Sequence, residues 1–181
     1  MLEDIKRHLL ASIDTIVSTP KQFVLHPDKD FSRTSPLSLK QMIAAILTMG
    51  GKSLSKELLD VDLPVSPSAF VQRRYRIKSQ AFYDLFKDFT AKLPSPNDLP
   101  FLAVDGSDVS IPRNRLDQST AIQTGKSHTP YNLIHINALY ELESGTYQGL
   151  VIQDKAEADE RAALVTMMEN SPFWTCPSSD G

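Results

Sequence analysis

Apolar residues recur at helical spacing through the first half of the chain. The stripe over residues 2–16 predicts a first helix, which should end before Pro20 because proline breaks helices. A second stripe over residues 38–49 predicts a helix that the glycines at 50–51 terminate. A short helix is expected over residues 53–60, so this half is predominantly helical.

The longest predicted helix begins at Ser66-Pro67 and continues to Leu93, just before Pro94. Serine is a favoured N-cap residue, and proline is a favoured first residue of a helix. The apolar stripe that we expect to be buried is Ala69, Phe70, Ile77, Ala81, Phe82, Leu85, Phe86 and Phe89.

Four cations lie close together early in this predicted helix, at Arg73, Arg74, Arg76 and Lys78. Such side chains can bind the phosphate backbone of DNA, and one of them can also reach a base. The order of helix, glycine turn, short helix and basic helix is similar to a helix-turn-helix, although the connections here are longer. A solvated charged face explains the same residues equally well, so both interpretations stay open.

The second half of the chain mixes strand and helix patterns. Residues 94–100 are rich in proline and predict a linker between a helical domain at 1–98 and a second domain at 99–170. Residues 171–181 show no periodicity and are interpreted as an irregular tail.

A short apolar run at 101–104 predicts a buried strand that ends on Asp105, with Gly106-Ser107 as a turn. The strand can resume at 109–111. A carboxylate at a strand end is exposed at the sheet edge, where a metal ion or a substrate can reach it. An ordinary Asp-Gly turn is the alternative interpretation. Asp108 is expected to face away from Asp105 and to lie at the surface.

After a predicted loop at 112–130, alternating apolar residues predict a strand over 131–142. A turn at 143–145 and a partner strand at 146–152 complete a hairpin. His135 lies in the first of these strands, where we expect a packed or surface residue rather than a metal ligand. The apolar face of that strand consists of Ile134, Ile136, Ala138, Tyr140 and Leu142.

The last predicted element is a helix over residues 154–170. Asp154 is its expected N-cap, and Glu157 completes a capping box. Its buried face is expected to hold Ala158, Ala162, Val165 and Met168.

Charge is divided unevenly between the two halves. Residues 1–95 carry 14 Lys and Arg against 10 Asp and Glu, whereas residues 96–181 carry 5 against 12. This asymmetry favours a nucleic-acid-binding part beside an acidic part, with chance as the competing explanation. The single Cys176 fits a reducing compartment, and no signal peptide or membrane-spanning run is visible. We therefore expect a cytoplasmic protein without a membrane partner.

From about residue 37 to residue 170, the chain resembles bacterial insertion-sequence transposases of the DDE class, in the IS-four-type branch. The resemblance implies an α+β fold in which a helical DNA-binding domain precedes an RNase H-like core, represented here by its first three strands and first helix. It is carried by the order and spacing of four stretches, namely Ser68 to Arg74, Ala103 to Ser107, Tyr131 to Tyr140, and Tyr147 to Gln153.

Such enzymes hold two metal ions, here Mg²⁺, between three carboxylates, and the ions activate water and then a DNA 3′-hydroxyl for attack on phosphate. By position, Asp105 matches the first catalytic Asp and would be a metal ligand. The resemblance places the second Asp on a strand after the helix at 154–170 and the Glu on a later helix, and neither has a counterpart here. Because one carboxylate cannot hold two ions, we expect that this chain alone cuts no DNA.

The resemblance implies double-stranded DNA carrying the terminal repeats of the element as the partner, and a homodimer is compatible with it. The tail at 171–181 is interpreted as out-of-frame translation of a truncated transposase. Two other functions stay open at this point. The first is a stand-alone DNA-binding module that competes with intact transposase without catalysis, and the second is a genomic remnant with no selected role.

Overall fold

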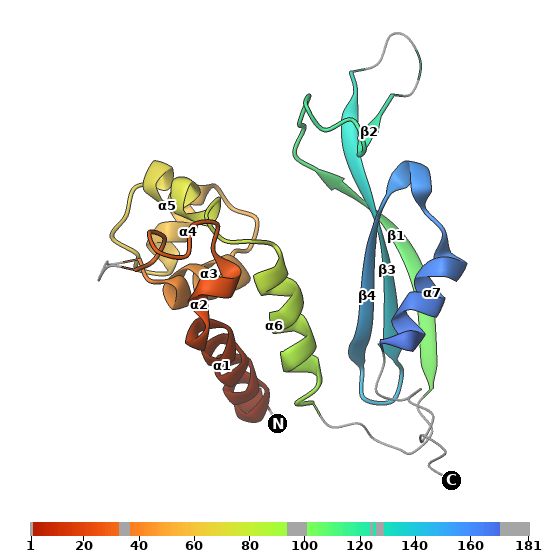
Figure 1. Cartoon of the computed structure of the whole chain (residues 1–181), viewed down its shortest axis with the longest axis horizontal. Helices are drawn as coiled ribbons and strands as arrows, with labels where there is room; N and C mark the ends of the chain where they lie inside the picture. Colours follow the sequence, from red (N-terminus) through yellow and green to blue (C-terminus); the bar gives the residue numbers. More distant parts are fainter. Residues whose placement is uncertain (1, 33–36, 94–100, 124, 126–128, 171–181) are drawn as a thin grey trace. The chain divides into compact units, whose positions relative to one another are not determined.

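The computed structural model describes residues 2–32, 37–93, 101–123, 125 and 129–170. The chain separates into two units, Met1–Leu93 and Pro94–Gly181 (Figure 1). The described residues form seven helices and a four-stranded antiparallel sheet, so the expected α+β class is confirmed. None of these helices is long and apolar enough to cross a membrane. The predicted linker at 94–100 and the predicted tail at 171–181 lie outside the described residues.

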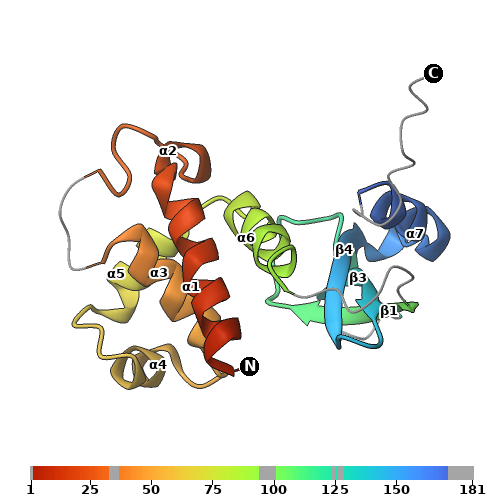
Figure 2. The same ribbon diagram turned by 90° about the horizontal axis from the view of Figure 1, so that it is seen from below.

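In the first unit, the longest helix, α1, lies alongside the last one, α6 (Figure 2). Ile13 and Ile16 of α1 and Ala81 and Leu85 of α6 belong to one buried apolar cluster. Burial of each of the larger side chains, Ile13, Ile16 and Leu85, stabilises the fold by about 1.5–3 kcal/mol. The helices are α1 (Leu2–Ser18), α2 (Pro20–Phe23), α3 (Leu39–Thr48), α4 (Leu54–Asp60), α5 (Pro67–Arg74) and α6 (Gln80–Thr90).

Serine side chains cap the first turns of α3 and α5. Ser38 Oγ accepts a hydrogen bond from the backbone N–H of Gln41 at 3.2 Å, and the Gln41 side chain accepts from the Ser38 N–H at 2.8 Å. Ser66 Oγ accepts from the backbone N–H of Ala69 at 3.2 Å, with Pro67 as the first helical residue. The Ser66 cap predicted from the sequence is therefore confirmed.

The single long helix predicted over residues 66–93 is wrong, because the chain breaks into α5 and α6. Between the two helices, Ile77 forms an isolated antiparallel bridge with Val24, and both side chains are buried. The residues that flank this bridge make two further backbone hydrogen bonds of 2.9 Å. A residue paired in this way is extended, so the tertiary contact with Val24 outweighs the helical pattern of the local sequence.

Asp30 links the loop after α2 to the segment between α5 and α6. Its carboxylate is 3% exposed, accepts a hydrogen bond from the His26 N–H at 2.9 Å, and pairs with the Arg76 guanidinium at 3.3 Å. Burial opposes the charged form of Asp30, but the hydrogen bonds from His26 and the charge of Arg76 outweigh it and hold the pKa of Asp30 below its ordinary value. The Arg76 side chain therefore contributes to the fold of this unit.

Asp30→Asn is expected to destabilise the first unit by about 1 kcal/mol at neutral pH. The folded-state pKa of Asp30 is lowered, so its contribution is complete above the unfolded-state value of about 3.9 and is lost as pH falls through the folded-state value. Thermal melts followed by circular dichroism should show a difference in thermal midpoint between wild type and variant, and this difference should narrow below about pH 4. Asp28→Asn, at an exposed neighbour, is the control. A difference in thermal midpoint that stays constant into strong acid would contradict the stabilising role of the charged Asp30 carboxylate.

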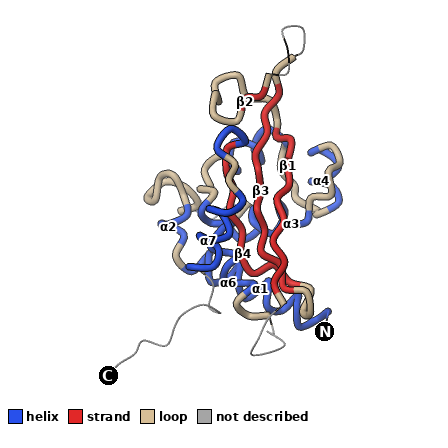
Figure 3. Tube along the Cα trace, turned by 90° about the vertical axis from the view of Figure 1, so that its right-hand side faces the viewer, coloured by secondary structure: helices blue, strands red, loops and turns tan. Residues whose placement is uncertain are grey.

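In the second unit, the central strand β3 (Tyr131–Glu141) pairs with every other described strand (Figure 3). β1 (Leu102–Ile111) and β4 (Thr146–Asp154) flank it on opposite sides, and the two-residue β2 (Ala121–Ile122) pairs with its first residues. A short 3₁₀ turn, η1 (Lys155–Glu157), and the helix α7 (Glu160–Glu169) follow β4.

β1 runs without a break, so the strand end that we predicted at Asp105 is wrong. Asp105 pairs with Ala138 and Gly106 pairs with Asn137, in the middle of a ten-residue strand. An Asp-Gly pair turns readily when it is isolated, but here pairing with β3 continues on both sides of it. The alternative interpretation of these two residues as an ordinary turn is excluded for the same reason.

The predicted turn at 143–145 is confirmed, and a buried carboxylate supports it. Glu141 accepts hydrogen bonds from the backbone N–H groups of Ser144 at 2.5 Å and Glu143 at 3.1 Å. Hydrogen bonding by Ser144, through its side chain and its backbone, and by the Glu143 N–H holds the pKa of Glu141 below its ordinary value. Gly145 has a φ of +67°, a conformation that glycine adopts without steric cost.

α7 packs on one face of the sheet through Ala163 and Met167, which are buried with Leu139 of β3. Gly149 of β4 permits this approach, because a Cβ atom there would lie 3.2 Å from the Met167 Cβ. The face of β3 under the helix is therefore the one that carries Leu139. The apolar positions that we singled out, such as Ile136, lie on the opposite face.

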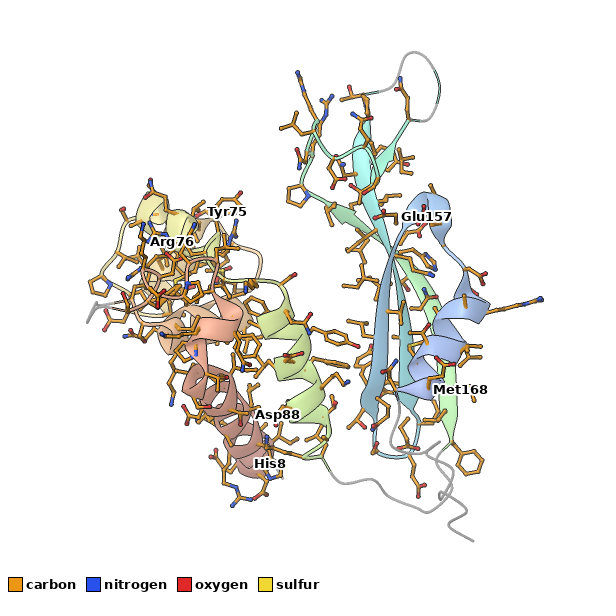
Figure 4. The ribbon with its side chains drawn as sticks, viewed as in Figure 1. His8, Tyr75, Arg76, Asp88, Glu157 and Met168 are labelled. Atoms are coloured by element: carbon orange, nitrogen blue, oxygen red, sulfur yellow. The ribbon has the colours of Figure 1, made fainter. Side chains whose placement is uncertain are left out.

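The predicted start and buried face of the last helix are wrong. Its N-cap is Asp159 rather than Asp154, because the Asp159 carboxylate accepts from the N–H groups of Arg161 and Ala162 at 3.0 Å. The later start and the observed rotation of the helix expose Val165, which is 54% exposed. Figure 4 labels Glu157 in the turn before α7 and Met168 near the end of the helix.

Candidate functional site

Asp105 lies on the face of β1 opposite α7. Side chains alternate along a strand, and its neighbour Gly106 lies against Glu160 of α7. The Asp105 side chain is exposed, and its Oδ1 atom accepts a hydrogen bond from the Gly106 N–H at 3.0 Å. Its cross-strand partner Ala138 offers no polar group. The Asp105 carboxylate is thus exposed to solvent, and its partner on β3 is not a carboxylate.

The residues around Asp105 do not fit a two-metal centre. Within the described ranges, no three His, Cys, Asp or Glu side chains lie close enough together to hold a metal ion. A pair of Mg²⁺ ions needs several carboxylates that bridge and flank them. We therefore derive no metal-dependent step for the described part of the chain.

The structure also contains a polar cluster under the start of α7 that the sequence did not reveal. Asp108 Oδ2 pairs with Lys155 Nζ at 2.7 Å, and Asp108 Oδ1 pairs with His135 Nδ1 at 2.7 Å. Hydrogen bonds from Lys155 and His135 hold the pKa of Asp108 below its ordinary value. Asp108 faces away from Asp105 and lies at the surface, as expected, but it also joins three elements.

The absence of a side chain at Gly106 leaves room for this cluster. A Cβ atom at this position would lie 2.6 Å from His135 Nε2 and 2.8 Å from Glu160 Oε1. The His135 side chain is 8% exposed, and its Nε2 atom lies 3.8 Å from the Glu160 carboxylate. The glycine after Asp105 is therefore explained by close packing beneath α7.

Three of the four predicted DNA-binding cations, Arg73, Arg76 and Lys78, contact other segments of the first unit. Arg73 donates to the carbonyl of Leu37 at 2.9 Å, and its guanidinium lies over the Phe31 ring at 5.0 Å. Lys78 donates to the carbonyl of Gln22 at 3.0 Å. Both side chains are half-buried, so these cations have intramolecular roles.

Arg76 and Arg74 are the more exposed of the four. Arg76 pairs with Asp30 but keeps about half of its side chain exposed, at 47%. Arg74 is exposed, and its guanidinium lies over the neighbouring Tyr75 ring at 5.6 Å. Figure 4 labels Arg76 and Tyr75 just after α5. Only Arg73 and Arg74 belong to α5, so the four cations do not share one helix face.

No family model, curated protein or solved structure matches the chain. The resemblance to DDE transposases therefore stays a hypothesis that depends on the residues quoted for it.

Gly106→Ala is expected to destabilise the second unit by about 1–3 kcal/mol, because the new methyl group overlaps the His135 ring and the Glu160 carboxylate. Ser107→Ala is the matched control, since this neighbour is exposed on the opposite face. Urea unfolding followed by circular dichroism measures both variants. Equal stability of the two variants would show that α7 does not pack against Gly106 in solution.

Proposed function

We propose that this chain is an incomplete DDE-type transposase, with a DNA-binding helical unit followed by the first part of an RNase H-like core. The observation that carries the proposal is the placement of Asp105. Asp105 lies on β1, which pairs with β3 alone among the described strands. Its side chain is on the face of the sheet opposite α7. A catalytic carboxylate must be exposed in this way to reach DNA.

The strand directions support a core that continues beyond α7. β1 and β4 are both antiparallel to β3, so they run in the same direction. α7 contacts β4, β3 and β1, and therefore lies across the sheet. A parallel strand after such a helix completes a crossover and would pair beside β1. The second Asp implied by the resemblance would then lie next to Asp105.

Under this proposal, the present chain contributes binding rather than cleavage. Asp105 would be one ligand of a Mg²⁺ pair, and the remaining carboxylates would come from segments beyond α7. The partner is double-stranded DNA that carries the ends of the element. Cleavage and strand transfer belong to the complete protein, because the described carboxylates do not assemble a metal centre.

A stand-alone DNA-binding module is the second candidate function. It is favoured by the buried apolar cluster of the first unit, which is complete in itself, together with the exposed Arg74. In this case the chain would occupy the ends of the element and exclude intact transposase from them.

We expect no Mg²⁺-dependent nicking of supercoiled plasmid by the purified chain, because one carboxylate cannot hold two metal ions. Gel electrophoresis of the plasmid with and without Mg²⁺ measures this. Nicking that Asp105→Ala abolishes would show that the chain is a complete nuclease and would overturn this part of the proposal.

Arg74→Ala is expected to weaken DNA binding and to leave the thermal midpoint unchanged. Each lost phosphate contact lowers the slope of log affinity against log salt by about 0.9. Arg76→Ala is the matched comparison, and it should lower the thermal midpoint because Asp30 loses its cationic partner. Fluorescence anisotropy with a labelled duplex measures affinity between about 50 and 200 mM salt. If Arg74→Ala binds with the wild-type slope, the assignment of this surface fails.

The genomic sequence after the codon for Asn170 separates the two candidate functions. A truncated transposase predicts that one reading frame continues with an apolar strand ending in Asp and, later, a helix with Glu. If no frame restores these carboxylates, the stand-alone binding module is favoured.

A further inference from the structure

The segment after β1, over residues 113–120, is tied to β3 by one buried side chain. Asn132 is 2% exposed, and its amide donates to the carbonyl oxygens of Asn114 and Asp117, both at 3.3 Å. The same amide donates to the Thr120 hydroxyl at 2.9 Å. The Asn132 side-chain oxygen accepts from the Asn114 N–H at 2.9 Å. The two N–H hydrogens of this amide are shared among the three acceptors, and together with the accepted bond they tie Asn114, Asp117 and Thr120 to β3.

Asp117 tightens the same loop from within. Its carboxylate accepts from the hydroxyls of Thr120 at 2.8 Å and Ser119 at 3.0 Å. These hydrogen bonds hold the pKa of Asp117 below its ordinary value, so it remains charged and bound to its own loop. The Asp117 carboxylate therefore has its hydrogen-bond donors within its own loop.

The outer surface of the loop presents two arginines. Arg113 and Arg115 are exposed, and neither guanidinium makes an ion pair or a hydrogen bond with another described residue. They line a cleft of about 420 Å³ together with the side chains of Asn114, Gln118 and Gln123. The cleft thus combines two cations with residues that carry side-chain amides.

This concentration of positive charge stands out in an acidic half. Residues 96–181 contain 5 Lys and Arg against 12 Asp and Glu, and two of the five cations lie in this loop. Of the others, Lys155 is bound to Asp108. Guanidinium groups match the geometry of phosphate oxygens and bind them through paired hydrogen bonds. The loop therefore suits an anionic ligand, in contrast to the acidic sequence around it.

We propose that the loop at 113–123 binds the phosphodiester backbone of duplex DNA through Arg113 and Arg115. A polymer is favoured over a single phosphate because the two exposed arginines are two positions apart and a DNA strand offers a separate phosphate to each. The inference rests on the proposed function only in taking DNA as the ligand. It adds a contact in the second unit, separate from Arg74 and from Asp105.

The test compares full-length chains by fluorescence anisotropy with a labelled random-sequence DNA duplex, because phosphate contacts do not depend on base sequence. The Arg113→Ala/Arg115→Ala variant should bind about tenfold more weakly, with the salt slope reduced by about 2. Arg161→Ala is the matched control, since it removes an exposed arginine of the same unit outside the loop. Arg113→Lys/Arg115→Lys should retain the wild-type slope because the charges remain. Thermal melts should be unchanged in all variants.

The outcomes separate this inference from the proposed function. If wild type and Arg74→Ala differ but the double alanine variant binds like wild type, the loop contact is wrong and DNA binding by the first unit stands. If the wild type shows no salt-dependent DNA binding, both proposals fail. If the double alanine variant loses affinity for an RNA duplex of the same sequence and not for DNA, the ligand is RNA and the inference is overturned.

Discussion

The second unit depends on the polar residues that β3 buries. This strand pairs with every other described strand, so its buried positions meet several neighbouring segments. Asn132 holds the loop before it, His135 bonds to Asp108, and Glu141 binds the turn after it. Asn137 donates to Gln153 of β4 at 2.8 Å. Because buried polar groups are costly without partners, these contacts specify one register of the sheet.

The same constraint places the candidate site. With His135 opposite Asp108, the register sets Asp105 opposite Ala138, and alternation turns its carboxylate away from α7. A shift by one residue would direct Asp105 toward the helix and Gly106 away from it. The polar cluster beneath α7 thus determines which side of β1 is open to a ligand, although none of its members belongs to that open side.

Local chemistry explains which parts of the fold were predictable. The Ser66 cap, the glycines after α3 and the turn at 143–145 act within a few residues, so the sequence reveals them. The break at Ile77 depends on Val24, and the continuous β1 depends on pairing with β3. Contacts between distant residues leave no local pattern. For the same reason, Asp105 could be proposed from the sequence, whereas the partners of Arg76 and the ordered loop at 113–123 could not.

The bridge between Val24 and Ile77 has a consequence for how the first unit folds. It closes a loop of roughly fifty residues, and such closure is slow because the chain entropy is lost before the contact forms. Arg76 and Lys78 are adjacent to this bridge, so they reach their native positions only after both ends of the unit have come together.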